Sequence, residues 1–309
     1  MRNVIHAALV ASAMLGCCHA FAEELWDPHL RGVDEGLAAG ALPPPGVYFV
    51  NNSYFLPDGY VGDSKSTSTK LQAYVNVPIL LWTTGVKVLG ADYGVAIAQP
   101  FDYTNLNVGH VEVGNHWGTY NTVLMPAILS WKLPYDLHVK TQFAVYVDNG
   151  SSSASTKNSP SAGVGAAMAN WTFEPGLGLS WLHDGWNISV QMLYETNTAD
   201  NNSSKAFNGG KYQSGDQLAF DYTITRTIGK WVVGVGAYEN NQLQRDNFCV
   251  SATNCGGQPG TATLSFAVGP IVGYNFGPIE LMAIFNHQTV NHNDVGGDTF
   301  NLRTVIPLY

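Results

Sequence analysis

Charged residues are scarce in this sequence of 309 residues. They make up 12% of the chain, about half the fraction of an average soluble domain. The 14 Lys and Arg residues are outnumbered by 23 Asp and Glu and form no cluster. Because nucleic-acid binding needs clustered positive charge, we expect no nucleic-acid partner. Glycine and aromatic residues are abundant instead, with 33 Gly, 15 Tyr, 13 Phe and 8 Trp. This balance suits a strand-rich wall that faces lipid.

Long hydrophobic runs are also missing. No polar-free stretch reaches about 18 residues, the length that indicates a membrane-spanning helix. The first 22 residues instead have the pattern of a secretory signal, with Arg2, an apolar stretch from Val4 to Leu15 and a cleavage site at Ala20-Phe21-Ala22. Cleavage before Cys17, which would make a lipoprotein, fits the pattern less well. We therefore expect an exported chain that has no helical span.

Cysteine is nearly absent from the expected mature chain. Cys17 and Cys18 fall within the signal, which leaves Cys249 and Cys255. These two lie close together in an exported chain, so a disulfide that closes a short loop is expected. A metal site is the alternative for this pair, but no His lies nearby in the sequence to complete it. We predict no metal and no cofactor.

The main positive signal is the alternation of apolar and polar residues, which is the period of a β-strand with two different faces. It is clear in residues 71–81, 135–147 and 186–196, and these segments lack the spacing of an amphipathic helix. The same pattern along the whole chain predicts about twelve strands. Their expected positions are 45–56, 69–82, 85–98, 120–132, 135–147, 170–183, 186–196, 214–228, 231–241, 261–274, 278–288 and 299–309.

The connections between these strands alternate in length. Short turns are expected at Thr83-Thr84, Leu133-Pro134, Asp184-Gly185, Gly229-Lys230 and 275–277, and long polar loops at 57–68, 99–119, 148–169, 197–213, 242–260 and 289–298. This alternation is typical of an all-β, antiparallel, up-and-down barrel in the bacterial outer membrane, with an even number of strands and periplasmic termini. We assign residues 1–22 to the signal, 23–44 to a periplasmic or lumenal segment, and 45–309 to the barrel.

The two faces of each strand predict which side chains line the lumen. In such a barrel the apolar face contacts lipid, as expected for Val139 and Val190, and the polar face points inward. The inward residues could form a polar network that fills a narrow barrel, a path for solutes, or both. The lumen-lining candidates are Gln72, Asn76, His138, Lys140, Gln142, Asn187, Gln191, Glu195, Asp221, Thr223, Glu280, Asn286 and Arg303.

Residues 27–41 differ from the strands. Asp27 can cap a helical turn that begins at Pro28, so a short amphipathic turn or two is expected. The triple proline at 43–45 cannot join the interior of a sheet and provides a stiff lead into the first strand. Because this segment is tethered at the mouth of the barrel, it could fold into the lumen. The gate or plug candidates are Leu30, Arg31, Asp34, Glu35, Pro43, Pro44 and Pro45.

Two motifs carry a resemblance to a known family. The stretch Gly36–Phe49, followed by Asn51-Asn52 and a Tyr, resembles the opening of outer-membrane proteins described as "MetA-pathway of phenol degradation" or as transporters. Residues Trp171–Gly178 are similar to a second motif of that family, and the likeness spans nearly the whole mature chain. The resemblance implies an outer-membrane barrel that accompanies the breakdown of aromatic compounds and takes part in uptake.

The predicted function is passive uptake of small, partly apolar or aromatic solutes by a channel surrounded by outer-membrane lipid. No oligomeric state is predicted. A structural or adhesive barrel is the alternative. A barrel lipid hydrolase is less favoured, because that chemistry pairs a His with a Ser two positions along one strand face. The nearest arrangement is His287-Gln288-Thr289, so we predict no enzyme.

The expected disulfide can be tested by mass spectrometry of the unreduced protein. If Cys249 and Cys255 are joined, the peptide that contains them should be lighter by two hydrogen atoms than after reduction. Loss of the bond should change stability little, because it restrains an outer loop rather than the barrel. Two thiols that both react with an alkylating reagent, in protein taken directly from the membrane, would contradict the pairing.

Overall fold

The computed structural model describes residues 26–63, 69–109, 111–151, 167–168, 170–199, 211–251, 254–255 and 262–308. The expected signal, Tyr309 and large parts of the loops expected at 148–169, 197–213 and 242–260 lie outside these residues. Within the described ranges, no helix combines the length and the apolar character needed to cross a bilayer.

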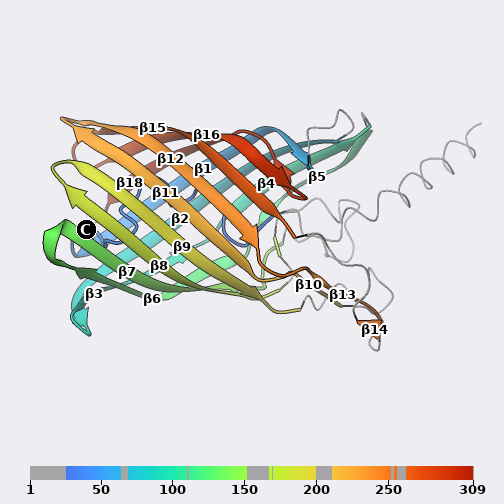
Figure 1. The fold of residues 1–309 in the computed structure, drawn as a ribbon, viewed down its shortest axis with the longest axis horizontal. Helices are drawn as coiled ribbons and strands as arrows, with labels where there is room; N and C mark the ends of the chain where they lie inside the picture. The colour runs from blue at the N-terminus through green and yellow to red at the C-terminus, as the bar shows by residue number, and fades with distance from the viewer. Residues whose placement is uncertain are drawn as a thin grey trace, which may run out of the picture.

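The described strands form one large antiparallel sheet that closes on itself, as Figure 1 shows. Closure occurs because β1 pairs with β2 on one side and with β18 on the other. Over the described ranges, twelve of the fifteen strands in this sheet make the barrel wall, which confirms the predicted architecture. The wall strands are β1 (Gly46–Val61), β2 (Thr69–Val88), β3 (Ala91–Ala98), β6 (Thr122–Lys132), β7 (Leu137–Val147), β8 (Thr172–His183), β9 (Trp186–Asn197), β11 (Gln217–Ile228), β12 (Trp231–Gln242), β15 (Leu264–Asn275), β16 (Glu280–His292) and β18 (Thr299–Pro307).

Short connections gather at one end of the barrel, which we call the turn end; the opposite end is the loop end (Figure 1). Asp184 and Gly185 connect β8 to β9 with φ angles of 47° and 77°. Such angles are those of the tight hairpin turns that match the twist of the flanking strands, and Asp-Gly is a favoured pair there. The turn at Gly229-Lys230 is likewise where it was predicted. Between β6 and β7 lies the 3₁₀ turn η1 (Pro134–Asp136).

The turn predicted at Thr83-Thr84 is wrong. β2 continues to Val88, and the chain reverses at Leu89-Gly90, where φ is 52° and 79°. The pairing of β2 with β3 shifts register between Thr83 and Lys87, and Gly85 has a φ of 75°. A glycine tolerates this left-handed conformation, so the strand accommodates a bulge instead of ending. The third wall strand accordingly starts at 91 rather than 85.

The predicted loop at 99–119 is also wrong, because it forms the hairpin β4 (Phe101–Val108) and β5 (Val111–Thr119). β4 pairs with the first half of β2, whereas β3 pairs with the second half. β4 and β3 thus lie end to end beside β2. At the loop end, the β4–β5 hairpin reaches past the other wall strands (Figure 1).

Further short strands occupy the loop end. β17 (Val295–Gly296) pairs with the last residues of β1. β10 (Lys211–Gln213), β13 (Asn247–Ser251) and β14 (Asn254–Cys255) form a separate three-stranded sheet. The register of β13 and β14 places Cys249 opposite Cys255 in the backbone. The disulfide itself stays a prediction.

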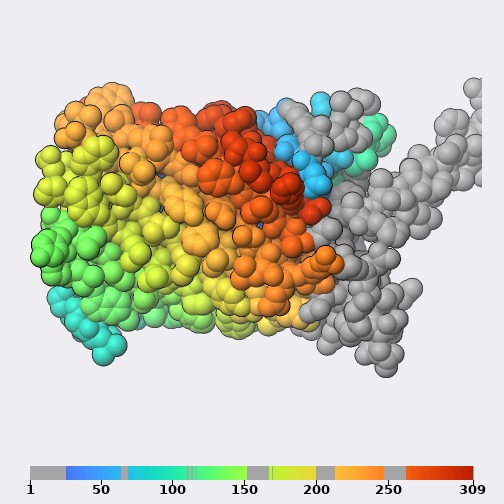
Figure 2. Space-filling model, in the orientation of Figure 1, coloured from blue at the N-terminus to red at the C-terminus, as the bar shows by residue number. Residues whose placement is uncertain are grey.

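Many of the large side chains exposed on the wall are apolar. In the space-filling view the wall forms a continuous surface between the two ends of the barrel (Figure 2). Arg226 lies 5.2 Å from the ring centroid of Trp186, close to the turn end, and Trp231 is exposed at the same level. An apolar band bordered by aromatic and charged side chains is characteristic of a barrel surrounded by lipid. Exposed apolar residues of the band include Ile188, Ile224, Val233, Val235, Val268 and Val272.

Two substitutions on β11 test this environment. Ile224 and Ile228 point to the same side, but Ile224 lies deeper in the band and Ile228 beside the turn. Arginine at Ile224 should cost about 2 to 4 kcal/mol of unfolding free energy, and arginine at Ile228 about 0 to 1, because the cost depends on depth in the bilayer. Reversible unfolding in lipid vesicles measures both values. Equal costs at the two positions would contradict a lipid-facing surface.

Candidate functional site: the barrel lumen

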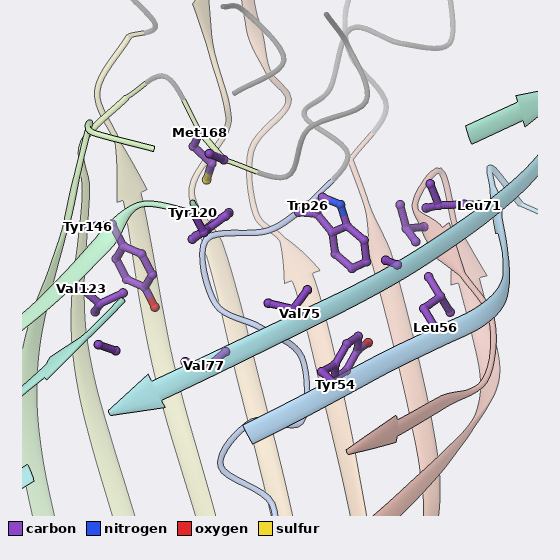
Figure 3. Close-up of a cluster of buried hydrophobic side chains, with 14 of the residues drawn as sticks. Trp26, Tyr54, Leu56, Leu71, Val75, Val77, Tyr120, Val123, Tyr146 and Met168 are labelled. Atoms are coloured by element: carbon purple, nitrogen blue, oxygen red, sulfur yellow. The ribbon is translucent and has the colours of Figure 1, made fainter. Parts of the chain in front are cut away.

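Residues 26–42, which we call the lumenal segment, lie within the barrel and contact inward-facing side chains of the wall. Trp26 packs near Leu56 and Leu71 toward the loop end (Figure 3). At the other end of the segment, the hydroxyl of Ser130 donates a hydrogen bond of 2.9 Å to the carbonyl of Gly40. The segment therefore runs lengthwise through the lumen before β1 begins.

Tight turns give the segment its shape. The backbone N–H groups of Val33 and Leu37 each bond to the carbonyl three residues earlier, at 3.0 and 3.1 Å. This agrees with the expected short turns. Gly32 and Gly36 have φ angles of 71° and 83°, and a Cβ atom at Gly36 would lie 2.3 Å from Sδ of Met282. Glycine is favoured at Gly36 because a φ of 83° is strained for a residue that has a Cβ atom.

Polar side chains of the wall bind the backbone of the segment. The carboxylate of Asp221 accepts hydrogen bonds from the N–H groups of Gly32 and Asp34, at 3.1 and 2.8 Å. The hydroxyls of Thr223 and Ser180 accept from Gly36 and Gly40, both at 2.7 Å. These bonds satisfy backbone groups that would otherwise be buried without partners.

Arg303 is the largest fully buried side chain, among those described, that contacts the segment. Its guanidinium donates to the carbonyls of Val33 and Glu35 and, at 2.9 Å, to Oδ1 of Asn52. Asn286 donates to the Glu35 carboxylate at 2.8 Å. Hydrogen bonds that involve a charged group are stronger than neutral ones, so these contacts fasten the centre of the segment to β16 and β18.

A second ionic group holds the segment nearer the loop end. Arg31 pairs with Asp27 and with Asp294, and its Nη1 donates to the carbonyl of Val295 at 2.7 Å. The Asp27 carboxylate also accepts a 2.6 Å bond from Asn240. Buried charges are stable only when they are paired and hydrogen-bonded, which is the case for this guanidinium.

The electrostatics of the segment are dominated by buried acids. Burial, together with the neighbouring Asp221 carboxylate, raises the pKa of Glu35 well above its ordinary range. Burial alone would lower the pKa of His29. The carboxylates of Asp221 and Glu174, each 3.6 Å from a ring nitrogen, outweigh it and raise the pKa of the imidazole well above its ordinary value.

The opposite side of the lumen is apolar and encloses a cavity of about 470 Å³. Its wall comes from β1, β2, β3 and β6, and the lumenal segment closes it from the other side. The cavity lies beside the cluster drawn in Figure 3. The apolar residues that line it include Trp26, Leu30, Val33, Leu37, Leu42, Val50, Tyr54, Val75, Val77, Ile79, Leu81, Ala96, Ala98, Tyr120, Val123, Met125 and Ile128.

The prediction for β2 was inverted. Val75 and Val77 are buried inside the barrel, whereas Gln72 is exposed on the outer surface and Asn76 bonds to outward-facing Ser53. Gln72 and Asn76 therefore do not line the lumen. β2 has 20 residues, although about 9 to 11 suffice to cross a bilayer. Its first half lies at the loop end, beside β4, so polar side chains there face outward and apolar ones pack within.

The other predicted lumen residues lie on the inward-facing positions of their strands. Lys140 and Gln142 border the cavity, and Asn187 donates to the carbonyl of Gly36 at 3.4 Å. His138 and Glu280 are partly buried toward the turn end. The residues of this set that are buried are Gln142, Gln191, Glu195, Asp221, Thr223, Asn286 and Arg303.

The gate candidates lie in two groups. Leu30, Arg31 and Asp34 border the cavity, and Glu35 is fully buried. Of the three prolines, Pro43 also borders the cavity, whereas Pro44 and Pro45 are exposed at the turn end. The carbonyl of Pro44 accepts a 2.8 Å hydrogen bond from the hydroxyl of Tyr48.

Several lumen residues were missed by the sequence reading. Asn52 and Glu174 are buried on inward faces, and Asp294 lies in the connection before β17. Glu174 could have been found, because it alternates with Phe173 in the Trp171–Gly178 motif. Asp294 could not, since only the fold brings it to Arg31.

The arrangement considered for a lipid hydrolase is not assembled. Nδ1 of His287 lies 2.9 Å from Asp298, and both side chains are exposed on the outer surface. The hydroxyl of Thr289 donates instead to the carbonyl of Phe266 at 3.3 Å. The imidazole therefore does not activate this hydroxyl.

Comparison with known proteins agrees with this architecture. A family model described as "Putative MetA-pathway of phenol degradation" matches residues 56–304. The chain belongs to this family. Among solved structures, the COG4313 outer membrane channel from Pseudomonas putida F1 is similar in fold, with a TM-score of 0.70, 13% identity, and coverage of 89% of this chain and 99% of that one.

Other similarities are looser. A Pseudomonas aeruginosa FadL homologue matches with a TM-score of 0.46 and 10% identity, over 93% of this chain and 100% of that one. A deletion mutant of the TodX monoaromatic hydrocarbon channel matches with a TM-score of 0.45 and 11% identity, over 85% and 90%. No curated protein matches this chain.

Substitution of Arg303 tests how the lumenal segment is held. Arg303→Met should weaken the attachment by about 1.5 to 3 kcal/mol for each hydrogen bond lost, because a charged donor is removed from buried carbonyls. In an Ala38→Cys background, a thiol reagent should then label the segment faster than without the substitution. Arg226→Met, on the outer surface, is the matched control and should leave the labelling rate unchanged. Equal rates in all three proteins would contradict the role of Arg303.

Proposed function

We propose that this protein is an outer-membrane channel for the passive uptake of small, partly apolar or aromatic compounds. The observation that carries the proposal is the division of the lumen into a polar side, bound to the lumenal segment, and an apolar side that encloses a cavity. Water-filled porins have a polar interior. A continuous apolar wall inside a barrel instead suits solutes that leave water readily.

The size and lining of the cavity fit this class of solute. A volume of about 470 Å³ lies within the range of about 300 to 1,000 Å³ that is usual for small-molecule sites. Trp26, Tyr54 and Tyr120 supply aromatic surface, and Lys140 and Gln142 supply polar groups at the border. An aromatic ring with one polar substituent could contact both kinds of group at once.

The lumenal segment is the proposed gate. It occupies the polar side of the lumen along its length, and its hydrogen bonds to Asp221, Thr223 and Arg303 hold it in place. A solute that passes from the loop end to the turn end must displace part of it. We assign the turn end to the periplasm because short turns face that side in barrels of this type.

The family to which the chain belongs supports a role in the uptake of aromatic compounds. Its description concerns phenol degradation, and the similar Pseudomonas putida structure is titled an outer membrane channel. Uptake of an aromatic nutrient is a step that breakdown of such a compound requires. A barrel that takes up aromatic compounds is consistent with both.

Solute flux into liposomes tests the function. Phenols, aromatic acids, alkanes and sugars are compared for the wild type and Ala98→Phe. Ala98 is buried and borders the cavity, so phenylalanine should fill part of it and reduce the flux of aromatic solutes several-fold. Ala283→Phe, on the lipid-facing side of β16, is the matched control and should leave flux unchanged.

Deletion of residues 27–41 tests separately whether the lumenal segment acts as the gate and whether the apolar wall is the solute path. Faster flux after deletion would support the gate, and unchanged selectivity for aromatic solutes would support the apolar wall as the path. The absence of flux for every solute, with and without the segment, would favour a structural or adhesive barrel. Hydrolysis of lipid by the purified protein would favour an enzyme.

A further inference from the structure

A buried cluster of one imidazole and two carboxylates joins the lumenal segment to the wall. His29 belongs to the segment, Glu174 to β8 and Glu195 to β9. One ligand atom from each of the three lies within 4.8 Å of the others. All three side chains are more than nine-tenths buried, at 6%, 0% and 0% exposure. Of the three residues, only His29 borders the cavity of the proposed solute path.

Several polar atoms of this cluster have no hydrogen-bond partner. Oε1 of Glu174 is buried without a hydrogen bond, and so is Nε2 of His29, whose nearest carboxylate, that of Asp221, lies 3.6 Å away. The backbone N–H of His29 lies beside Glu195, but neither oxygen of that carboxylate accepts a well-formed hydrogen bond. A buried carboxylate that lacks partners is costly, and two of them side by side also repel each other. A cation bound between the two carboxylates would offset this repulsion.

We propose that His29, Glu174 and Glu195 bind a divalent transition-metal cation that fastens the lumenal segment to β8 and β9. A divalent cation would neutralise both carboxylates. Zinc binds His nitrogen and carboxylate oxygen at about 2.0 to 2.2 Å, and the three side chains are near enough to reach one ion after small rotations. A site with one nitrogen donor and only three protein ligands disfavours Ca²⁺, which takes six to eight oxygen ligands.

The surroundings of the cluster resemble those of known metal sites. The hydroxyl of Tyr146 donates a 2.8 Å hydrogen bond to Oε2 of Glu174, which leaves Oε1 for the ion. Nε2 of His29 lies 3.6 Å from the carboxylate of Asp221, whereas Nδ1 faces Glu174. Metal-bound imidazoles commonly direct their second nitrogen to a carboxylate, which orients the ring. Tyr146 on β7 and Asp221 on β11 would therefore help to position the metal ligands.

Metal binding by the purified, folded full chain tests the proposal. After chelation and dialysis, ZnCl₂ and MnCl₂ are titrated in a calorimeter at neutral pH, and bound metal is counted by elemental analysis. The wild type should bind one ion per chain. His29→Gln and Glu195→Gln should each weaken binding by more than about tenfold, because even loss of an outer-shell partner of a metal ligand costs about 10- to 100-fold. Matched controls are His138→Gln and Glu280→Gln, which change a lumenal imidazole and carboxylate outside the cluster.

A second measurement covers the case in which Glu195→Gln fails to fold. His29 lies outside the strands, so His29→Gln should still form the barrel. Zn²⁺ should raise the unfolding temperature of the wild type, because a ligand stabilises the state that binds it, and should leave that of His29→Gln unchanged. If the wild type binds neither Zn²⁺ nor Mn²⁺, the proposal is overturned. That result is expected if the two carboxylates share a proton instead of a metal ion. Binding that survives in His29→Gln, or that is lost equally in the controls, would also overturn it.

Discussion

Closure of the sheet is the constraint on which the rest of the structure depends. In lipid, the backbone N–H and C=O groups of a strand have no water to bond to, so a sheet with a free edge is excluded. The pairing of β1 with β18 removes the edge. Once the sheet is closed, each strand must place alternate side chains inside and outside. The lipid dictates the outer set, and the inner set must fill or line a lumen of limited width.

The lumen is filled unequally, and the charges explain why. Strands β8, β9, β11, β16 and β18 bring acids, amides and Arg303 to one side. Buried groups of this kind need partners, and the turns of the lumenal segment supply backbone N–H and C=O groups at the required spacing. The apolar side, from β1 to β6, offers few such groups, among them Asn52 and Ser130, so the segment leaves a cavity there. The position of the cavity follows from where hydrogen bonds can be made.

The alternation of apolar and polar residues predicted side-chain orientation best in the strands that cross the lipid. On β9 and β11 most outer positions are apolar and most inner ones polar, so alternation assigns Gln191 and Asp221 to inward-facing positions. On β2 the same rule fails, because half of that strand lies beyond the span that a bilayer requires. There the outer face meets water, and Val75 and Val77 pack inward as they would in a soluble protein. Alternation identifies two faces but does not say which solvent each one meets.

The sequence by itself determined the closed antiparallel barrel, its approximate strand number and the distinct character of residues 27–41. Each of these follows from local patterns: side-chain periodicity, turn residues and prolines. Only the tertiary structure decided that Arg31 meets Asp294, that Arg303 reaches the carbonyls of the segment and that His29 lies between Glu174 and Asp221. These partners are far apart in the chain. Their proximity depends on strand register and on the path of the segment through the lumen, and neither is encoded in a local pattern.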